Sequence, residues 1–328
     1  MHVFIDTNIL LSFFHFSKED LDALHNVFAS HKDGSAKVNL TQQVCDEFRR
    51  NREVKIKDAL KRFKDARISP LLPSFMKAYP EYDKIMSCAE ELQKLLKAIS
   101  DKADQDIEKQ TLLADALIKD IMGSYKIIPT TAERFGRARV RSDLGNPPGK
   151  NNSLGDALNW ETALEVVPPG EDLHVISEDG DYFSPLREDA PHPFLEQEWF
   201  EKKGSKLRTY RKLAVFMSEH FDGVAFSYDK DKEALVDVLF ETGSFAGTHA
   251  VIAKLEKYSY FSLKEVGRIL DAAHENDQFG WIVADYDVSD FLARVAVPRQ
   301  GALTKAEHQA VIATVIDEQN ARKTLQSG

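Results

Sequence analysis

Residues 2–8 read HVFIDTN, and the rest of the chain is organised around this stretch. Three of its first four residues are apolar, which predicts a short buried strand ending at Ile5. Asp6 would then lie at the carboxyl end of the strand, where open α/β sheets place their ligand crevices. Because the mostly apolar run 9–14 follows directly, the carboxylate is costly unless something pairs with it. A metal ion would do so, and capping of the next helix by Asp6 or Thr7 is the alternative.

The composition is that of an ordinary globular protein. The 328 residues are 43% hydrophobic and 29% charged, a length that favours two domains over one. The formal net charge of -10 does not point to nucleic-acid binding, so any such binding would need a local basic patch.

The compartment follows from what the sequence lacks. Its two cysteines, Cys45 and Cys88, fall in helical patterns and suggest neither a disulfide framework nor a zinc site. No apolar run approaches the ~18 residues that span a bilayer. The first strand begins at residue 2 and is needed for the fold, so we expect no signal segment. These features predict a protein of the reducing cytoplasm without a membrane partner.

Alternating strands and helices predict a parallel sheet. Ser17 begins a capping-box pattern for a helix that ends near Asp33, and Thr41 caps a long helix reaching about Ile68. Further strands are predicted at 37–40, 173–176 and 206–210, with helices at 193–203 and from the last strand to about Phe221.

Two regions depart from this alternation. Residues 70–127 contain three prolines and two helical stretches, 81–100 and 101–124, which predicts a helical insertion in the α/β domain of residues 1–221. Residues 222–328 form a second, mostly helical domain. Within it we predict helices at 229–240, 262–274 and 304–322, and a strand at 279–284.

The stretch 132–164 combines arginines, a Gly/Pro loop and an acid. Residues 145–150 must form a loop, and Ser153 with Asp156 has the spacing of a capping box. Asp156 could therefore serve only its helix N-terminus, where a negative charge is worth about 0.3–1 kcal/mol. Asp179 and two neighbouring acids follow the strand 173–176, where they repel one another unless a cation sits among them.

Four acids share one geometric consequence. Each follows a strand or lies in the first turns of the next helix, and in a parallel sheet those places lie along one edge; the four are Asp6, Glu47, Asp156 and Asp179. Oxygen ligands without His or Cys select Mg²⁺ or Mn²⁺. Such ions can activate a water and neutralise charge on a phosphodiester.

In the order and spacing of its motifs, the chain resembles a PIN-domain nuclease of the bacterial branch with a longer helical insertion. The matching pieces lie within residues 1–221: FIDTN at 4–8, the helix with Glu47, RAR at 137–139 with GNPPGK at 145–150, GDAL at 155–158, and SEDGDY at 177–182. The resemblance implies a three-layer α/β/α sandwich with a mainly parallel sheet. It also implies cleavage of RNA by carboxylates that bind Mg²⁺ or Mn²⁺.

Carried over by position, the resemblance assigns roles to single residues. Asp6, Glu47, Asp156 and Asp179 become the metal-binding catalytic acids, with Asp181 a possible fifth. Thr7 and Asn8 would orient Asp6. Ser177 stands where many members carry Thr, which preserves the hydroxyl.

Basic residues near the acids are candidates for holding the RNA backbone, because Arg suits phosphate geometry. The candidates are Arg49, Arg137, Arg139, Arg141 and Lys150. Charge-rich helices are more often solvated faces, and that alternative is stronger for the lysines beyond Arg49.

Other functions remain open at this point. Asn8 stands where a haloacid-dehalogenase-like phosphatase needs a second Asp. A structure-specific DNA nuclease would use the same acids, and a catalytically silent nucleic-acid or protein binding module is the alternative from another class. Residues 222–328 could select substrate, bind a regulatory protein or form a homodimer. Base stacking by Tyr258, Tyr260 and Phe261 is possible there, but core packing is favoured.

Overall fold

The computed structural model describes residues 1–30, 36–65, 72–149, 153–221, 228–258 and 261–326. Its centre is a four-stranded sheet of β1 (His2–Ile5), β2 (Lys37–Val38), β3 (Leu173–Ile176) and β4 (Leu207–Tyr210). The strands lie in the order β2-β1-β3-β4, and every pair is parallel. The predicted parallel α/β sheet is therefore confirmed.

The register brings three strand ends to one level. Ile5 of β1 lies opposite Ile176 of β3, which lies opposite Tyr210 of β4. All residues of β1 and β3 are buried, as expected for central strands of a parallel sheet. The residues that follow these strands, beginning with Asp6 and Ser177, therefore emerge side by side at the carboxyl edge.

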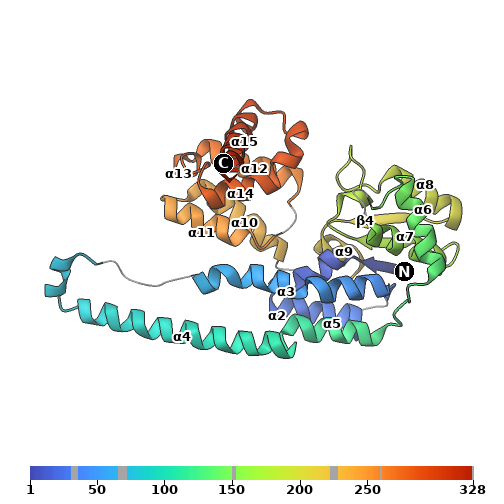
Figure 1. Ribbon diagram of the computed structural model, residues 1–328, viewed down its shortest axis with the longest axis horizontal. Helices are drawn as coiled ribbons and strands as arrows, with labels where there is room; N and C mark the ends of the chain where they lie inside the picture. Colours follow the sequence, from blue (N-terminus) through green and yellow to red (C-terminus); the bar gives the residue numbers. More distant parts are fainter. Residues whose placement is uncertain (31–35, 66–71, 150–152, 222–227, 259–260, 327–328) are drawn as a thin grey trace.

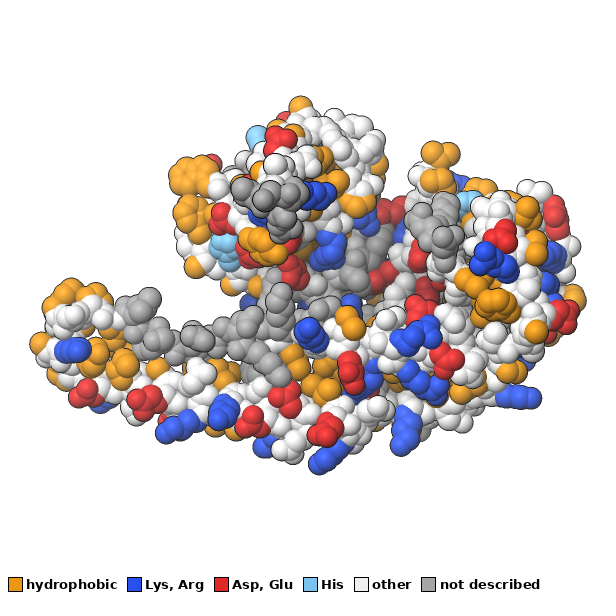
Figure 2. Space-filling model, viewed as in Figure 1, with side chains coloured by type: hydrophobic (Ala, Val, Ile, Leu, Met, Phe, Trp, Pro, Cys, Tyr) orange, Lys and Arg blue, Asp and Glu red, His pale blue; other side chains and the backbone are white. Residues whose placement is uncertain are grey.

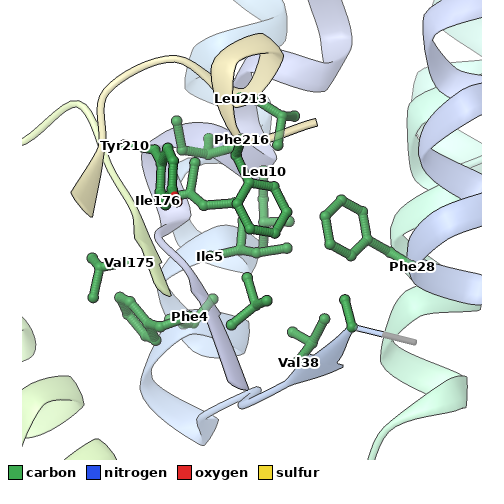
Figure 3. Close-up of a cluster of buried hydrophobic side chains, with 14 of the residues drawn as sticks. Phe4, Ile5, Leu10, Phe28, Val38, Val175, Ile176, Tyr210, Leu213 and Phe216 are labelled. Carbon is green, nitrogen blue, oxygen red and sulfur yellow. The ribbon is translucent and has the colours of Figure 1, made fainter. Parts of the chain in front are cut away.

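Helices cover both faces of the sheet (Figure 1). Trp160 and Trp199 pack against each other on one side, with ring centroids 5.8 Å apart. Phe28 and Phe216 do so at 6.2 Å on the other. Figure 3 shows Ile5 pointing toward Phe28 from the sheet. Strands that are buried on both faces require such a three-layer arrangement.

The predicted ends of two helices, near Asp33 and Ile68, lie outside the described residues. The helical elements before β3 include the predicted helices and one, at 132–143, that was not predicted. They are α1 (Thr7–Ser12), η1 (Phe13–His15), α2 (Lys18–Leu24), η2 (His25–Ala29), α3 (Gln42–Asp65), η3 (Ser74–Ala78), α4 (Tyr82–Lys109), α5 (Leu113–Ser124), α6 (Ala132–Asp143) and α7 (Leu154–Val166). One difference lies in the insertion. The helix predicted to end at Ser100 continues to Lys109, and the break falls at Gln110, which has a positive φ of 55°.

After β3 the chain forms η5 (Gly180–Tyr182), α8 (Pro193–Lys203) and α9 (Leu213–His220). A second set of helices comprises α10 (Tyr228–Glu241), α11 (Phe245–Leu255), α12 (Leu263–Glu275), α13 (Asp277–Gly280), α14 (Tyr286–Val295), η6 (Val297–Ala302) and α15 (Ala306–Gln326). They enclose a hydrophobic cluster of their own, which includes Tyr258 and Phe261. Core packing is thus their role, whereas Tyr260 lies outside the described residues.

The strand predicted at 279–284 is wrong. Asp277–Gly280 is helical, and a turn follows it. Phe279, Ile282 and Val283 are the buried members of this run, and their i, i+3, i+4 spacing is helical. A short apolar run does not distinguish a strand from such a buried helical turn.

Ionic contacts join the two sets of helices. Glu265 of α12 accepts a hydrogen bond from Lys212 at 3.0 Å and lies 3.2 Å from the buried Lys232. The Leu263 amide donates a hydrogen bond to the carboxylate of Glu188, and the backbone carbonyl of Glu188 accepts one from Arg211. Of the described helices, none is both long and apolar enough to cross a membrane.

Candidate functional site

Asp6 occupies the turn between β1 and α1. Its Oδ1 accepts the Thr7 amide at 2.7 Å, so the side chain caps α1. Its Oδ2 accepts from Asn8 Nδ2 at 3.0 Å and from the Ser177 hydroxyl. The helix cap that sequence suggested as an alternative is therefore present, and Asp6 combines it with contacts to β3.

Ser177 and Asn8 tie the two strand ends together. The Ser177 hydroxyl also accepts the Asp179 amide at 3.0 Å, and Asn8 Oδ1 accepts the Glu178 amide at 3.4 Å. The backbone that carries the acids after β3 is thereby fixed relative to Asp6. Asn8 and Ser177 thus both contact the Asp6 carboxylate through their side chains, and Thr7 does so through its backbone amide.

Asp179 and Asp181 lie in the turn that follows β3. Asp179 Oδ1 accepts the Asp181 amide at 2.8 Å, which begins η5. Asp181 Oδ2 accepts the amide of Gly149 at 3.0 Å, so the Gly/Pro loop closes against this acid. Gly149 has a φ of +108°, and an added Cβ would lie 2.5 Å from the Ser153 carbonyl oxygen. Only glycine fits there.

Asp156 lies in the first turn of α7. The Ser153 hydroxyl donates to its carboxylate, and Ser153 makes no side-chain hydrogen bond to the helix backbone. The predicted capping box is therefore wrong, because Ser153 is used by the acid instead.

Glu47 approaches Asp156 from α3. Its Oε2 accepts from Gln43 at 3.3 Å, and a Cβ on Gly155 would come within 2.6 Å of the same amide nitrogen. This close approach brings the start of α7 against α3. Asp46, the neighbouring acid, is engaged by Gln42 and Arg49 instead.

The acids act on one another electrostatically. Burial, and to a smaller extent the charges of Asp156 and Asp179, raise the pKa of Asp6 to about 7, against the opposing hydrogen bond from Ser177. Burial, with the charges of Asp179, Glu47 and Asp181, likewise raises the pKa of Asp156 to about 6. The structure thus brings all five predicted acids into one electrostatic neighbourhood.

Two buried polar groups lie beside the acids, and one of them, Tyr182, was not singled out from sequence. Tyr182, at the end of η5, is fully enclosed, and its pKa is raised well above the usual value by burial and then by the acids around it. In the described part of the chain, neither its hydroxyl nor Thr7 Oγ1 has a hydrogen-bond partner. Only the position of Tyr182 directly after the acidic run hinted at this location.

The donor set fits a hard divalent cation in chemistry. All five acids offer carboxylate oxygens, like charges destabilise one another without a cation, and unpartnered hydroxyls remain beside them. The carboxylates lie farther apart than the ligands of a closed metal site. Among the residues with described positions, no group of three His, Cys, Asp or Glu side chains could hold a metal as they stand.

The basic candidates divide by burial. Arg141 is buried, and its guanidinium binds Glu161, Glu198 and the Pro147 carbonyl. A role in holding RNA does not fit it, because its donors are taken by the protein.

The other basic candidates are more accessible. Arg137 is half-buried and ion-pairs with Glu133, Glu161 and Glu165. Arg139 and Arg49 are exposed, each beside one acid of its own helix. Lys150 lies outside the described residues.

Comparison with known proteins identifies a family for the N-terminal part of the chain. No curated protein and no solved structure matches the chain. A family model described as a PIN domain matches residues 3–182, which run from β1 to the end of η5 and include all five acids.

Proposed function

Because the chain belongs to the PIN-domain family, we propose that it is an endoribonuclease dependent on Mg²⁺ or Mn²⁺ and acting in the cytoplasm. PIN domains are usually nucleases, which supports a nuclease in general. The restriction to RNA and the metal requirement are the finer parts of the proposal. Its nuclease part would be residues 1–221, with 222–328 a separate domain.

The electrostatic effect of neighbouring acids on Asp6 and on Asp156 carries the proposal. These side chains come from the end of β1 and the start of α7, far apart in sequence. Asp6 is buried and Asp156 is partly buried, and the pKa of each is raised by burial and then by other acids of the same group. Helix caps alone would not need to share a neighbourhood. Such an arrangement is stabilised when a divalent cation offsets the repulsion.

Each residue would have a defined task. Asp6, Glu47, Asp156 and Asp179 would hold the cation, with Asp181 as a fifth acid. When bound, the cation would activate water and neutralise phosphodiester charge. Ser177 and Asn8 would keep the Asp6 carboxylate oriented through their hydrogen bonds. The more accessible Arg139, Arg137 and Arg49, with Lys150, are proposed to hold the backbone of the RNA.

A cleavage assay tests this function. The protein is incubated with labelled single-stranded RNA, structured RNA and DNA in Mn²⁺, Mg²⁺ or EDTA. We expect internal cleavage of RNA with either metal and none in EDTA. Asp156→Asn should abolish cleavage, while Asp22→Asn, at an exposed acid of α2, should not.

Each other outcome has a defined meaning. Cleavage of DNA alone would favour the structure-specific DNA nuclease. Binding of nucleic acid without cleavage in any metal would identify a silent binding module, for which the open spacing of the acids is the relevant observation.

A further inference from the structure

The insertion exposes a long amphipathic helix. Helix α4 has 28 residues, none of them buried, and it runs outward from the body of the molecule (Figure 1). Helices of globular proteins are mainly stabilised by packing an apolar face against a neighbour. A helix of this length without one buried side chain therefore calls for a partner.

One face of α4 carries a regular apolar stripe, here called the seam: Ile85, Cys88, Leu92, Leu95 and Ile99. Their spacings alternate between three and four residues, which is the heptad pattern of a coiled coil. The four large aliphatic side chains are 43%, 42%, 57% and 58% exposed in sequence order, and Cys88 is exposed as well.

A different face of the same helix meets the rest of the chain. The partly buried apolar positions follow their own helical spacing: Tyr82, Met86, Ala89, Leu96, Ala103 and Ile107. The Ile107 carbonyl accepts a hydrogen bond from Arg52 of α3, which also binds Asp115 of α5. The attachment of α4 to its own molecule thus leaves the seam to solvent.

We propose that the seam is a homodimer interface, in which it packs against the same seam of a second copy of this chain. In parallel pairs of helices, isoleucine is favoured at the first core position of each heptad and leucine at the second. Ile85, Ile99 and Leu95 follow this rule, whereas Leu92 and Cys88 do not. A two-fold interface needs a surface that is complementary to itself, and a straight stripe of interdigitating aliphatic side chains meets that need.

The charges beside the seam support a second copy over a nucleic acid. Acidic and basic side chains are interspersed along α4, beginning with Asp83 and Lys84 and continuing with Glu91 and Lys94. A phosphate backbone would require a basic face. Identical helices with mixed charges do not repel each other.

The outer end of the insertion, around η3, enlarges the apolar surface. Phe75 and Tyr79 are exposed there, at and just after η3, and Figure 2 shows hydrophobic side chains gathered at this end. The seam spans little more than two heptads, whereas self-sufficient coiled coils need about three to four. We therefore expect a dimer that dissociates on dilution.

Sedimentation velocity of the full chain tests the interface. From about 1 to about 100 μM, the wild-type protein should shift from monomer to dimer. The double variant Leu92→Glu/Leu95→Glu should remain monomeric, with a dissociation constant raised by about 100-fold or more because two charges would be buried. Lys97→Glu, an exposed change on the same helix outside the seam, should dimerise like the wild type.

Circular dichroism shows whether each variant keeps its helices, which exposed positions should allow. A wild-type chain that stays monomeric at the highest concentration would overturn the proposal. So would a dimer that survives the double substitution in the seam. Neither result depends on nuclease activity.

Discussion

The Ser177 hydroxyl donates a hydrogen bond to the carboxylate of Asp6, although the two residues are 171 positions apart in sequence. It joins the ends of the neighbouring strands β1 and β3 at the edge where the acids gather. This bond lowers the pKa of Asp6 against the larger, opposite effect of burial. Ser177 therefore helps to keep the carboxylate ionised as well as oriented.

Ser177→Ala should weaken metal use. Without the hydroxyl, the pKa of Asp6 rises further, so a higher pH is needed to ionise it. We expect the Mn²⁺ concentration for half-maximal cleavage to rise by about 10-fold or more, and the pH–rate profile to move upward. Ser177→Thr, which keeps the hydroxyl, is the matched variant and should restore both. Equal loss in both variants, without a pH shift, would indicate a packing role only.

Asp6→Asn should abolish cleavage while the protein stays folded. Asn can still accept the Thr7 amide, so the cap of α1 is kept, and the like-charge repulsion with Asp156 disappears. In EDTA at pH 8 we expect the variant to be more stable than the wild type, by up to about 4 kcal/mol for a shift of about three pKa units. Thermal unfolding measures this, with Asp22→Asn as control. A destabilised variant would show that ionised Asp6 is structurally required.

The pH dependence of metal-free stability has a definite sign. Asp6 and Asp156 have folded-state pKa values of about 7 and about 6, above the ordinary 3.8. Their stabilising contribution is present below about pH 4 and is lost as the pH rises through 6 to 7. The difference in unfolding free energy between wild type and Asp6→Asn in EDTA should follow this course. A difference independent of pH would contradict the raised pKa.

Added Mn²⁺ should change how the free energy of unfolding depends on pH. A cation binds the ionised carboxylates, so it competes with protons and stabilises the folded state more at pH 8 than at pH 5. Melting curves with and without Mn²⁺ at the two pH values make the comparison. Asp156→Asn should reduce the shift at pH 8.

Arg141 and Arg139 should behave oppositely. Arg141→Ala leaves Glu161 and Glu198 without their buried cation, which should cost about 3–5 kcal/mol of unfolding free energy. Arg139→Ala removes an exposed pair with Asp143 and should change stability by less than about 0.5 kcal/mol. If Arg139 contacts RNA, its loss reduces the salt dependence of binding. Denaturant unfolding and binding at several salt concentrations separate the two roles, and an unchanged salt slope would count against the contact.

Much of the α/β domain could be predicted from local pattern. Strands β1 and β3 are short apolar runs with polar ends, and α8 lies between Pro193 and Gly204, so their bounds were predictable. The parallel direction of the strands followed from alternation alone. In the C-terminal part, the run around Phe279 was ambiguous because a buried helical turn and a strand can have the same short apolar composition.

The identity of the candidate acids could be predicted from sequence, but the groups that surround them could be predicted only in part. Their places after strands or at helix starts suggested one shared edge. The location of Tyr182 among them depends on tertiary packing, as does the use of Ser153 by Asp156 in place of the helix backbone. The same holds for Arg141, whose partners lie on α7 and α8 and not within its own helix.

The loop from Glu178 to Glu188 is anchored at both ends by one arginine. Arg211 donates to the carbonyls of Glu178 and Glu188 and lies 3.8 Å above the ring of Phe183, while the Glu188 carboxylate receives the first amide of α12. Asp179 and Asp181 lie within this anchored loop. The positions of these two acids thus depend on contacts with both hydrophobic cores. Removing the C-terminal helices would remove one of the two attachments of this loop.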